Sequence, residues 1–197
     1  MTDPVLSRDD FVWHQPPASP RRYQLAPLTR RERNLFRRAL VAEGATYPGT
    51  EAMFAALRAA LQEIAPGNLA ELLGMVEAAE TEQADGGPGA ATVALAPIEA
   101  AARSVPAYAQ LLADRAYYLA AYPGLLARYA LRGWDGPGLP AFERRNGEVP
   151  EVLLDAVPDA ELADLGWAAH PLAFVTRSAE KNSAAPSPSP ASPMAGA

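Results

Sequence analysis

Apolar residues recur at helical spacing just after Thr29. In LTRRERNLFRRALVAEG, Leu35, Phe36 and Leu40 fall on one side of a helix drawn at 100° per residue. Thr29 and Glu32 have the spacing of a capping box, in which each side chain bonds the backbone amide of the other residue. Gly44 is a suitable C-terminal stop. The pattern predicts an amphipathic helix whose opposite side is basic, with Arg30, Arg31, Arg33, Arg37 and Arg38.

Two further helices are expected within the next 36 residues. TEAMFAALRAALQEI begins at Thr50 and NLAELLGMVEAAE at Asn68, and both residues are common helix N-caps. The apolar stripe of the first of these helices consists of Met53, Phe54, Leu57, Leu61 and Ile64. Residues 29–80 are therefore expected to form an N-terminal helical unit.

A small, polar segment rich in Gly and Pro follows this unit. Its sequence, TEQADGGPGAAT (residues 81–92), predicts a linker or a long surface loop. Helices are expected to resume beyond it, with Pro97 and Pro106 in first turns, a break at Pro123-Gly124 and a stop before Pro171. Residues 93–177 are thus predicted to be a second, C-terminal helical unit.

The two ends of the chain differ from the helical middle. Residues 1–28 are rich in proline and are expected to form an extended arm, within which FVWHQ and RYQLAPL alternate like short strands. Residues 178–197 consist mostly of Ser, Ala and Pro, which is typical of a disordered tail. The expected fold class is mainly α, with small multi-helix domains, this arm and this tail.

Composition and charge narrow the possible functions. The chain has 197 residues, of which 49% are hydrophobic, no Cys and a net charge of -6, which argues against general affinity for nucleic acid. No signal peptide and no membrane span is expected, so the sequence predicts a soluble cytoplasmic protein. Common phosphate, dinucleotide, zinc-protease and hydrolase motifs are missing, and we expect no catalytic residues, no cofactor and no metal.

Six residues are candidates for partner contacts. The basic side of the first helix could bind an acidic segment or phosphate, or it could simply be a solvated outer face. Large aromatic residues could anchor an interface or fill the core of a small helical domain. The candidates are Arg30, Arg31, Arg37, Arg38, Trp134 and Trp167. The sequence does not indicate an oligomeric state.

Three sequence blocks together resemble the tail assembly chaperones of long-tailed bacteriophages and prophages. They are YQLAPLTRRERNLFRRALVAEGATYP, FERRNGEVPEVLLDAVPDAELADLGWAAH and AEKNSAAPSPSP. The resemblance implies a non-enzymatic protein that binds the tape-measure protein and keeps it soluble in the host cytoplasm while tail-tube subunits assemble. It also implies that the protein is missing from the mature virion. The alternatives are a tail-completion or connector protein of the virion and a small regulatory protein that binds nucleic acid.

Many members of this family are also made in a longer form by a -1 ribosomal frameshift, and the extra domain recruits the tail-tube protein. The chain has sixteen Arg but only one Lys, Lys181, which suggests GC-rich coding. Glu180, Lys181 and Asn182 can be encoded as GAA AAA AAC, which contains the slippery heptamer A AAA AAC. A chance lysine near the edge of a domain is the alternative explanation.

Overall fold

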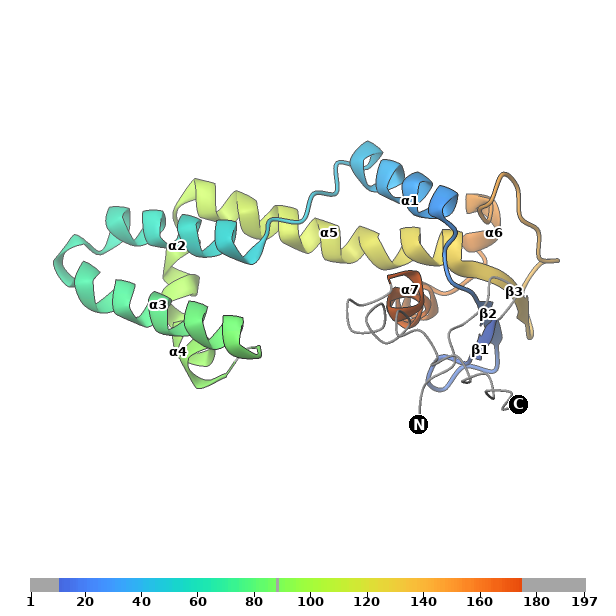
Figure 1. Cartoon of the computed structure of the whole chain (residues 1–197), viewed down its shortest axis with the longest axis horizontal. Coiled ribbons are helices and arrows are strands. Elements are labelled where there is room, and N and C mark those ends of the chain that lie inside the picture. Colours follow the sequence, from blue (N-terminus) through green and yellow to red (C-terminus); the bar gives the residue numbers. More distant parts are fainter. Residues whose placement is uncertain (1–10, 88, 175–197) are drawn as a thin grey trace, which may run out of the picture. The chain divides into compact units, whose positions relative to one another are not determined.

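The computed structural model describes residues 11–87 and 89–174 and divides the chain into two compact units (Figure 1). The sheet unit consists of the described parts of Met1–Phe36 and Leu126–Ala197, and the helical unit is Arg37–Leu125. The prediction of a mainly helical protein with short strands in the N-terminal arm is confirmed. The expected tail, residues 178–197, lies outside the described residues.

Helices account for the helical unit. They are α2 (Thr50–Ile64), α3 (Leu69–Asp85), α4 (Ala90–Ala102) and the first part of α5 (Pro106–Ala130), with a 3-10 turn at Pro66–Asn68. Leu57, Leu61, Val76, Leu95 and Tyr108 are almost completely buried in a shared core. The apolar stripe predicted for α2 is confirmed at Met53, Phe54, Leu57 and Leu61, whereas Ile64 is 37% exposed.

The turn between α3 and α4 is shorter than the predicted loop at residues 81–92. Helix α3 continues to Asp85 and α4 begins at Ala90. The Glu82 carboxylate reaches across the turn and accepts hydrogen bonds from the backbone amides of Gly89 (3.0 Å), Ala91 (3.2 Å) and Thr92 (2.9 Å). These bonds, with the Thr92 amide first, lower the pKa of Glu82. A side chain of α3 therefore caps α4, whose first amides have no partner within the helix.

Three antiparallel strands form the sheet of the other unit, in the order β1 (Val12–His14), β2 (Arg22–Leu25) and β3 (Leu131–Asp135). The register pairs His14 with Tyr23 and Tyr23 with Trp134. Both strands expected within FVWHQ and RYQLAPL are thus present. Tyr23 and Leu25 are 0% and 1% exposed, so β2 is a core strand of this unit.

Helices pack around this sheet and complete the unit. They are the start of α1 (Arg30–Ala42), the end of α5, α6 (Glu151–Leu154) and α7 (Asp159–Ala173). Helix α7 contacts β2 and accepts two hydrogen bonds from the strands through its carboxylates: the Tyr23 hydroxyl donates to Glu161 (2.5 Å), and His14 Nε2 lies 2.5 Å from Asp164. Phe36 of α1 packs against Tyr129 and Phe174, each with ring centroids 6.3 Å apart.

Several boundaries differ from those expected from the sequence. Pro97, Pro123 and Pro171 lie inside α4, α5 and α7, where the sequence predicted helix starts or stops. Residues 131–135, predicted to be part of the C-terminal helical unit, form β3 because they pair with β2. Gly49 rather than Thr50 is the N-cap of α2, and Asn68, the N-cap of α3, makes no side-chain capping bond. Sequence-distant pairing between β2 and β3 also places residues 11–36 and 126–174 in one unit.

The capping of α4 can be tested at Gly89. An added Cβ at this position would lie 2.3 Å from Glu82 Oε1, so Gly89→Ala should displace the carboxylate. Glu82→Gln should weaken the same bonds because the amide lacks the negative charge. We expect faster amide hydrogen exchange at Ala91 and Thr92 in both variants. The matched control is Glu77→Gln, an exposed residue of α3, and unchanged exchange relative to this control would contradict the capping role.

Candidate interaction surfaces

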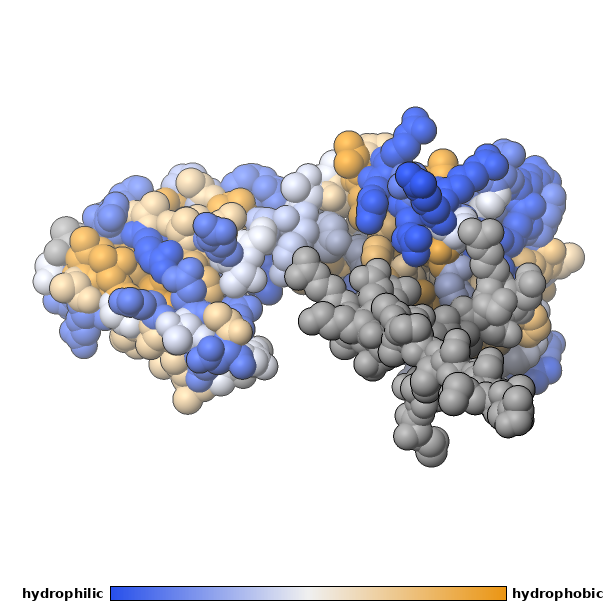
Figure 2. Space-filling model, in the orientation of Figure 1, coloured by the Kyte–Doolittle hydropathy of each residue, from blue (hydrophilic) through white to orange (hydrophobic). Residues whose placement is uncertain are grey.

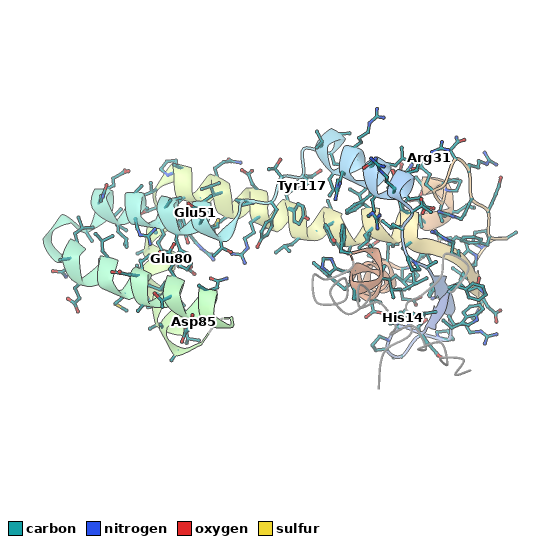
Figure 3. All side chains as sticks on the ribbon, viewed as in Figure 1. His14, Arg31, Glu51, Glu80, Asp85 and Tyr117 are labelled. Carbon is teal, nitrogen blue, oxygen red and sulfur yellow. The ribbon has the colours of Figure 1, made fainter. Side chains whose placement is uncertain are left out.

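The arginines predicted for the outer side of α1 do lie at the surface. Arg30, Arg31, Arg37 and Arg38 are exposed, whereas Arg33 is half-buried. Glu32, Phe36 and Leu40 are buried on the other side of the helix, at 6%, 2% and 8% exposure. Hydrophilic side chains gather over α1 in Figure 2, and Arg31 is labelled in Figure 3. We call Arg30, Arg31, Arg37 and Arg38 the arginine face.

The arginine face is unusual in its lack of ion pairs. Among residues 11–87 and 89–174, no carboxylate lies within ion-pair distance of these four side chains. Most other arginines of the described chain do have such a partner. These pairs are Arg21–Glu161, Arg22–Asp135, Arg58–Glu80, Arg128–Glu148, Arg132–Glu32, Arg144–Glu32 and Arg145–Glu143. Acidic partners are therefore available to arginines elsewhere, but not on α1.

Glu32 is the acidic residue closest in sequence to the arginine face, but its side chain is buried. Its side chain is 8% exposed and accepts from Arg144 Nη2 (2.8 Å) and Arg132 Nη2 (3.1 Å). The Thr29 amide also donates to it (2.8 Å), while the Thr29 hydroxyl accepts from the Glu32 amide (3.2 Å), which confirms the capping box. Burial raises the pKa of Glu32, but the bonds from Arg144 and Thr29 and the charge of Arg132 outweigh it and lower this pKa.

The two guanidinium groups on Glu32 also hold backbone carbonyls. Arg144 donates to the carbonyls of Gly147 (2.5 Å) and Tyr129 (3.1 Å), and Arg132 donates to those of Tyr129 (2.6 Å) and Pro27 (3.3 Å). We call Glu32 with these two arginines the Glu32 clamp. It ties the start of α1 to the end of α5, to β3 and to the loop at residues 144–147. The two guanidinium groups pair with a single carboxylate, so the Glu32 clamp carries a net positive charge close to the start of α1.

A second candidate surface lies at the start of β1, an edge strand of the sheet. Phe11, Val12 and Trp13 are 51%, 41% and 43% exposed, and they follow one another in the sequence. The guanidinium of Arg22 lies 4.7 Å from the centroid of the Trp13 ring. We call these three residues the apolar edge. Sequence reasoning identified the strand but not this surface, although three consecutive large apolar residues in an extended segment cannot all face one core.

The two candidate tryptophans have different surroundings. Trp134 is half-buried, donates through Nε1 to the carbonyl of Pro140 (2.7 Å) and packs edge-on against Phe142, with ring centroids 4.8 Å apart. It therefore holds the loop after β3. Trp167 is 47% exposed on α7, and its ring centroid lies 6.4 Å from that of His170. Only Trp167 has the exposure that a contact anchor needs.

Within residues 11–87 and 89–174, no three His, Asp or Glu side chains are grouped to hold a metal ion. No helix in these ranges combines the length and the apolar character needed to span a membrane.

In comparisons with known proteins, no family model matches the chain, and no curated protein and no solved structure is significantly similar to it. The resemblance to tail assembly chaperones therefore stays a prediction from sequence.

The Glu32 clamp should make a large contribution to stability. Glu32→Gln removes the negative charge between two largely buried guanidinium groups, and breaking a buried ion pair in this way costs about 3–5 kcal/mol. Urea denaturation at neutral pH measures the loss in the free energy of unfolding. The matched control is Glu143→Gln, which removes one carboxylate of an exposed pair with Arg145. Equal losses in both variants would show that the clamp does not stabilise the fold.

The clamp should also give stability a dependence on acid. Because the pKa of Glu32 is lower in the folded chain than in the unfolded chain, its contribution is complete above about pH 4.3, the ordinary carboxyl value. This contribution is lost as the pH falls through the folded-state pKa. We expect the stability difference between wild type and Glu32→Gln to shrink between pH 7 and pH 3 in urea titrations. A difference that stays constant over this range would contradict the lowered pKa.

Proposed function

We propose that this chain is a non-enzymatic tail assembly chaperone of a long-tailed bacteriophage or prophage. It binds the tape-measure protein in the bacterial host cytoplasm and keeps it soluble during tail assembly. Support comes from the three sequence blocks, which cover residues 23–48, 142–170 and 179–190. The first two blocks contribute most of β2, α1, α6 and most of α7, all within or adjoining the sheet unit.

The observation in the structure that favours protein binding is the apolar edge. A long helix with an apolar face is an aggregation hazard until its final partners cover it, and a chaperone must offer apolar surface in return. Phe11, just before the edge strand β1, and Val12 and Trp13 within it present such surface, with the two aromatic side chains on the face opposite Val12. Large aromatic side chains give much contact area at a small cost in conformational entropy. The apolar edge is thus our proposed contact for the tape-measure protein.

A longer form of the chain belongs to the same proposal. A -1 frameshift at the codons of Glu180, Lys181 and Asn182 would replace the end of the chain with a domain that recruits the major tail-tube protein. These three residues lie outside the described residues. Both forms would contain the sheet unit up to Phe174 and the whole helical unit, so the apolar edge would be common to them.

Co-expression with the long helical protein encoded next to this gene tests the proposal. We expect the chain to raise the soluble fraction of that protein and to co-purify with it. Phe11→Ala with Trp13→Ala should reduce recovery by about tenfold or more, since exposed aromatic anchors commonly contribute 1–2 kcal/mol each to binding. The control is Val93→Ala with Val152→Ala, two exposed apolar residues at 73% and 72% exposure outside the apolar edge.

Different results would support different functions. Failure of the wild-type chain to bind or solubilise the neighbouring protein would refute the chaperone proposal. Equal losses in the two double variants would refute the apolar edge as its contact. Mass spectrometry of purified particles separates a chaperone, which should be missing, from a tail-completion or connector protein, which should be present. Codons other than GAA AAA AAC, with no overlapping -1 reading frame, would refute the longer form.

A further inference from the structure

We infer that the exposed side of α1 is a docking face for an acidic α-helix whose carboxylates recur every seven residues. This inference concerns a surface other than the apolar edge and does not depend on the tail-assembly proposal. Its basis is the spacing, exposure and missing ion pairs of the arginine face.

The arginine face consists of two parallel rows along one continuous helix. Arg30 and Arg37 are seven residues apart, as are Arg31 and Arg38. Seven residues of an α-helix complete nearly two turns, with a drift of only about 20°, so each pair forms a row along the helix. Asn34 and Val41, also seven apart, fall between the two rows. A partner helix meets long cationic side chains on both sides and shorter side chains along the centre.

The centre of this face carries an exposed apolar side chain. Val41 is 77% exposed, the largest exposure among the large hydrophobic residues of the described chain. A valine at this position gains by contact with an aliphatic side chain of a partner. The flanking guanidinium groups can bind carboxylates through two parallel hydrogen bonds. The face therefore fits a helix with an aliphatic centre and acidic residues on both flanks.

The free chain bears an electrostatic cost for this arrangement. Arg30, Arg31 and Arg33 lie in the first turn of α1, where a positive charge opposes the helix dipole. Like charges three or four residues apart, such as Arg33 and Arg37, repel each other. Glu32 does not relieve this cost at the surface because Arg132 and Arg144 bind its carboxylate. An acidic partner would remove the repulsion on docking.

Charge elsewhere in the chain favours a protein helix over nucleic acid as the partner. The net charge is -6, and residues 43–99 hold many Glu and Asp side chains with Arg58 as their single basic residue. These acidic residues repel a long polyanion such as nucleic acid, whereas a short acidic helix would contact only the arginine face. The exposed Val41 side chain also favours a protein helix, because a phosphate group makes no favourable contact with an apolar side chain.

The test uses the full-length chain and two labelled peptides of about 21 residues, a length that supports helix formation. In the patterned peptide, two rows of Glu at seven-residue spacing flank a row of Leu and Ala. The scrambled peptide has the same composition with Glu spread over all faces. Fluorescence anisotropy should show binding of the patterned peptide about tenfold tighter than that of the scrambled one, which is the difference expected from a few aligned ion pairs.

Substitutions locate the site on the chain. Arg37→Gln with Arg38→Gln should weaken binding of the patterned peptide by about tenfold. The matched control, Arg103→Gln with Arg145→Gln, removes two exposed arginines outside α1 and should change affinity by less than about twofold. Circular dichroism of each variant checks that helix content is kept. As an independent measurement, a variant with all four arginines of the face changed to Glu should bind a peptide with Lys in place of Glu.

Three results would overturn the inference. Equal binding of the patterned and scrambled peptides would show that spacing plays no part. Equal losses in the α1 variant and its control would place the binding elsewhere. Tighter binding of a single-stranded oligonucleotide of equal charge, weakened by the α1 substitutions, would identify a nucleic-acid site instead. None of these results bears on the apolar edge, so the tail-assembly proposal would stand or fall by its own test.

Discussion

The buried carboxylate of Glu32 is the interaction on which the sheet unit depends most. Through Arg132 and Arg144 it joins the start of α1 to β3, to the end of α5 and to the loop at residues 144–147. Its charge matters more than its shape, because two largely buried guanidinium groups would otherwise face each other without compensation. The same contact holds the start of α1, where Arg30 and Arg31 are exposed.

This use of Glu32 has a second consequence, for the charge of α1. Outside α1, most arginines among the described residues have a carboxylate partner, and the pairs of Arg21 with Glu161 and Arg128 with Glu148 are examples. Glu32 is the one acidic residue within α1, and Arg132 and Arg144 bind its carboxylate. The arginine face therefore keeps its full charge. One ion-pair network thus joins parts of the sheet unit and leaves the arginines of α1 without a carboxylate partner among the described residues. The apolar edge at the start of β1 is an exposed surface of opposite character.

Local sequence signals predicted a large part of this structure. The capping box of Thr29 and Glu32, the amphipathic α1, the core stripe of α2 and the two N-terminal strands were all predicted from residue spacing. Proline was a poor guide, since Pro97, Pro123 and Pro171 lie within helices that packing maintains despite a lost hydrogen bond. The exposure of the arginine face was predicted from the helical period. Trp134, predicted as a partner contact, instead donates a hydrogen bond to the Pro140 carbonyl and packs against Phe142.

The sequence by itself determined the helical character of the chain, the start of α1 and the side of α1 that carries arginine, because these depend on neighbours within about four residues. Only the tertiary structure decided that residues 131–135 form a strand, that Glu32 binds two arginines 100 and 112 positions away, and that Phe11 to Trp13 stay exposed. Such features depend on which distant segments meet. The spacing of apolar residues in a single sequence does not show which distant segments meet, since a stripe that packs in the core and a stripe that contacts a partner have the same spacing.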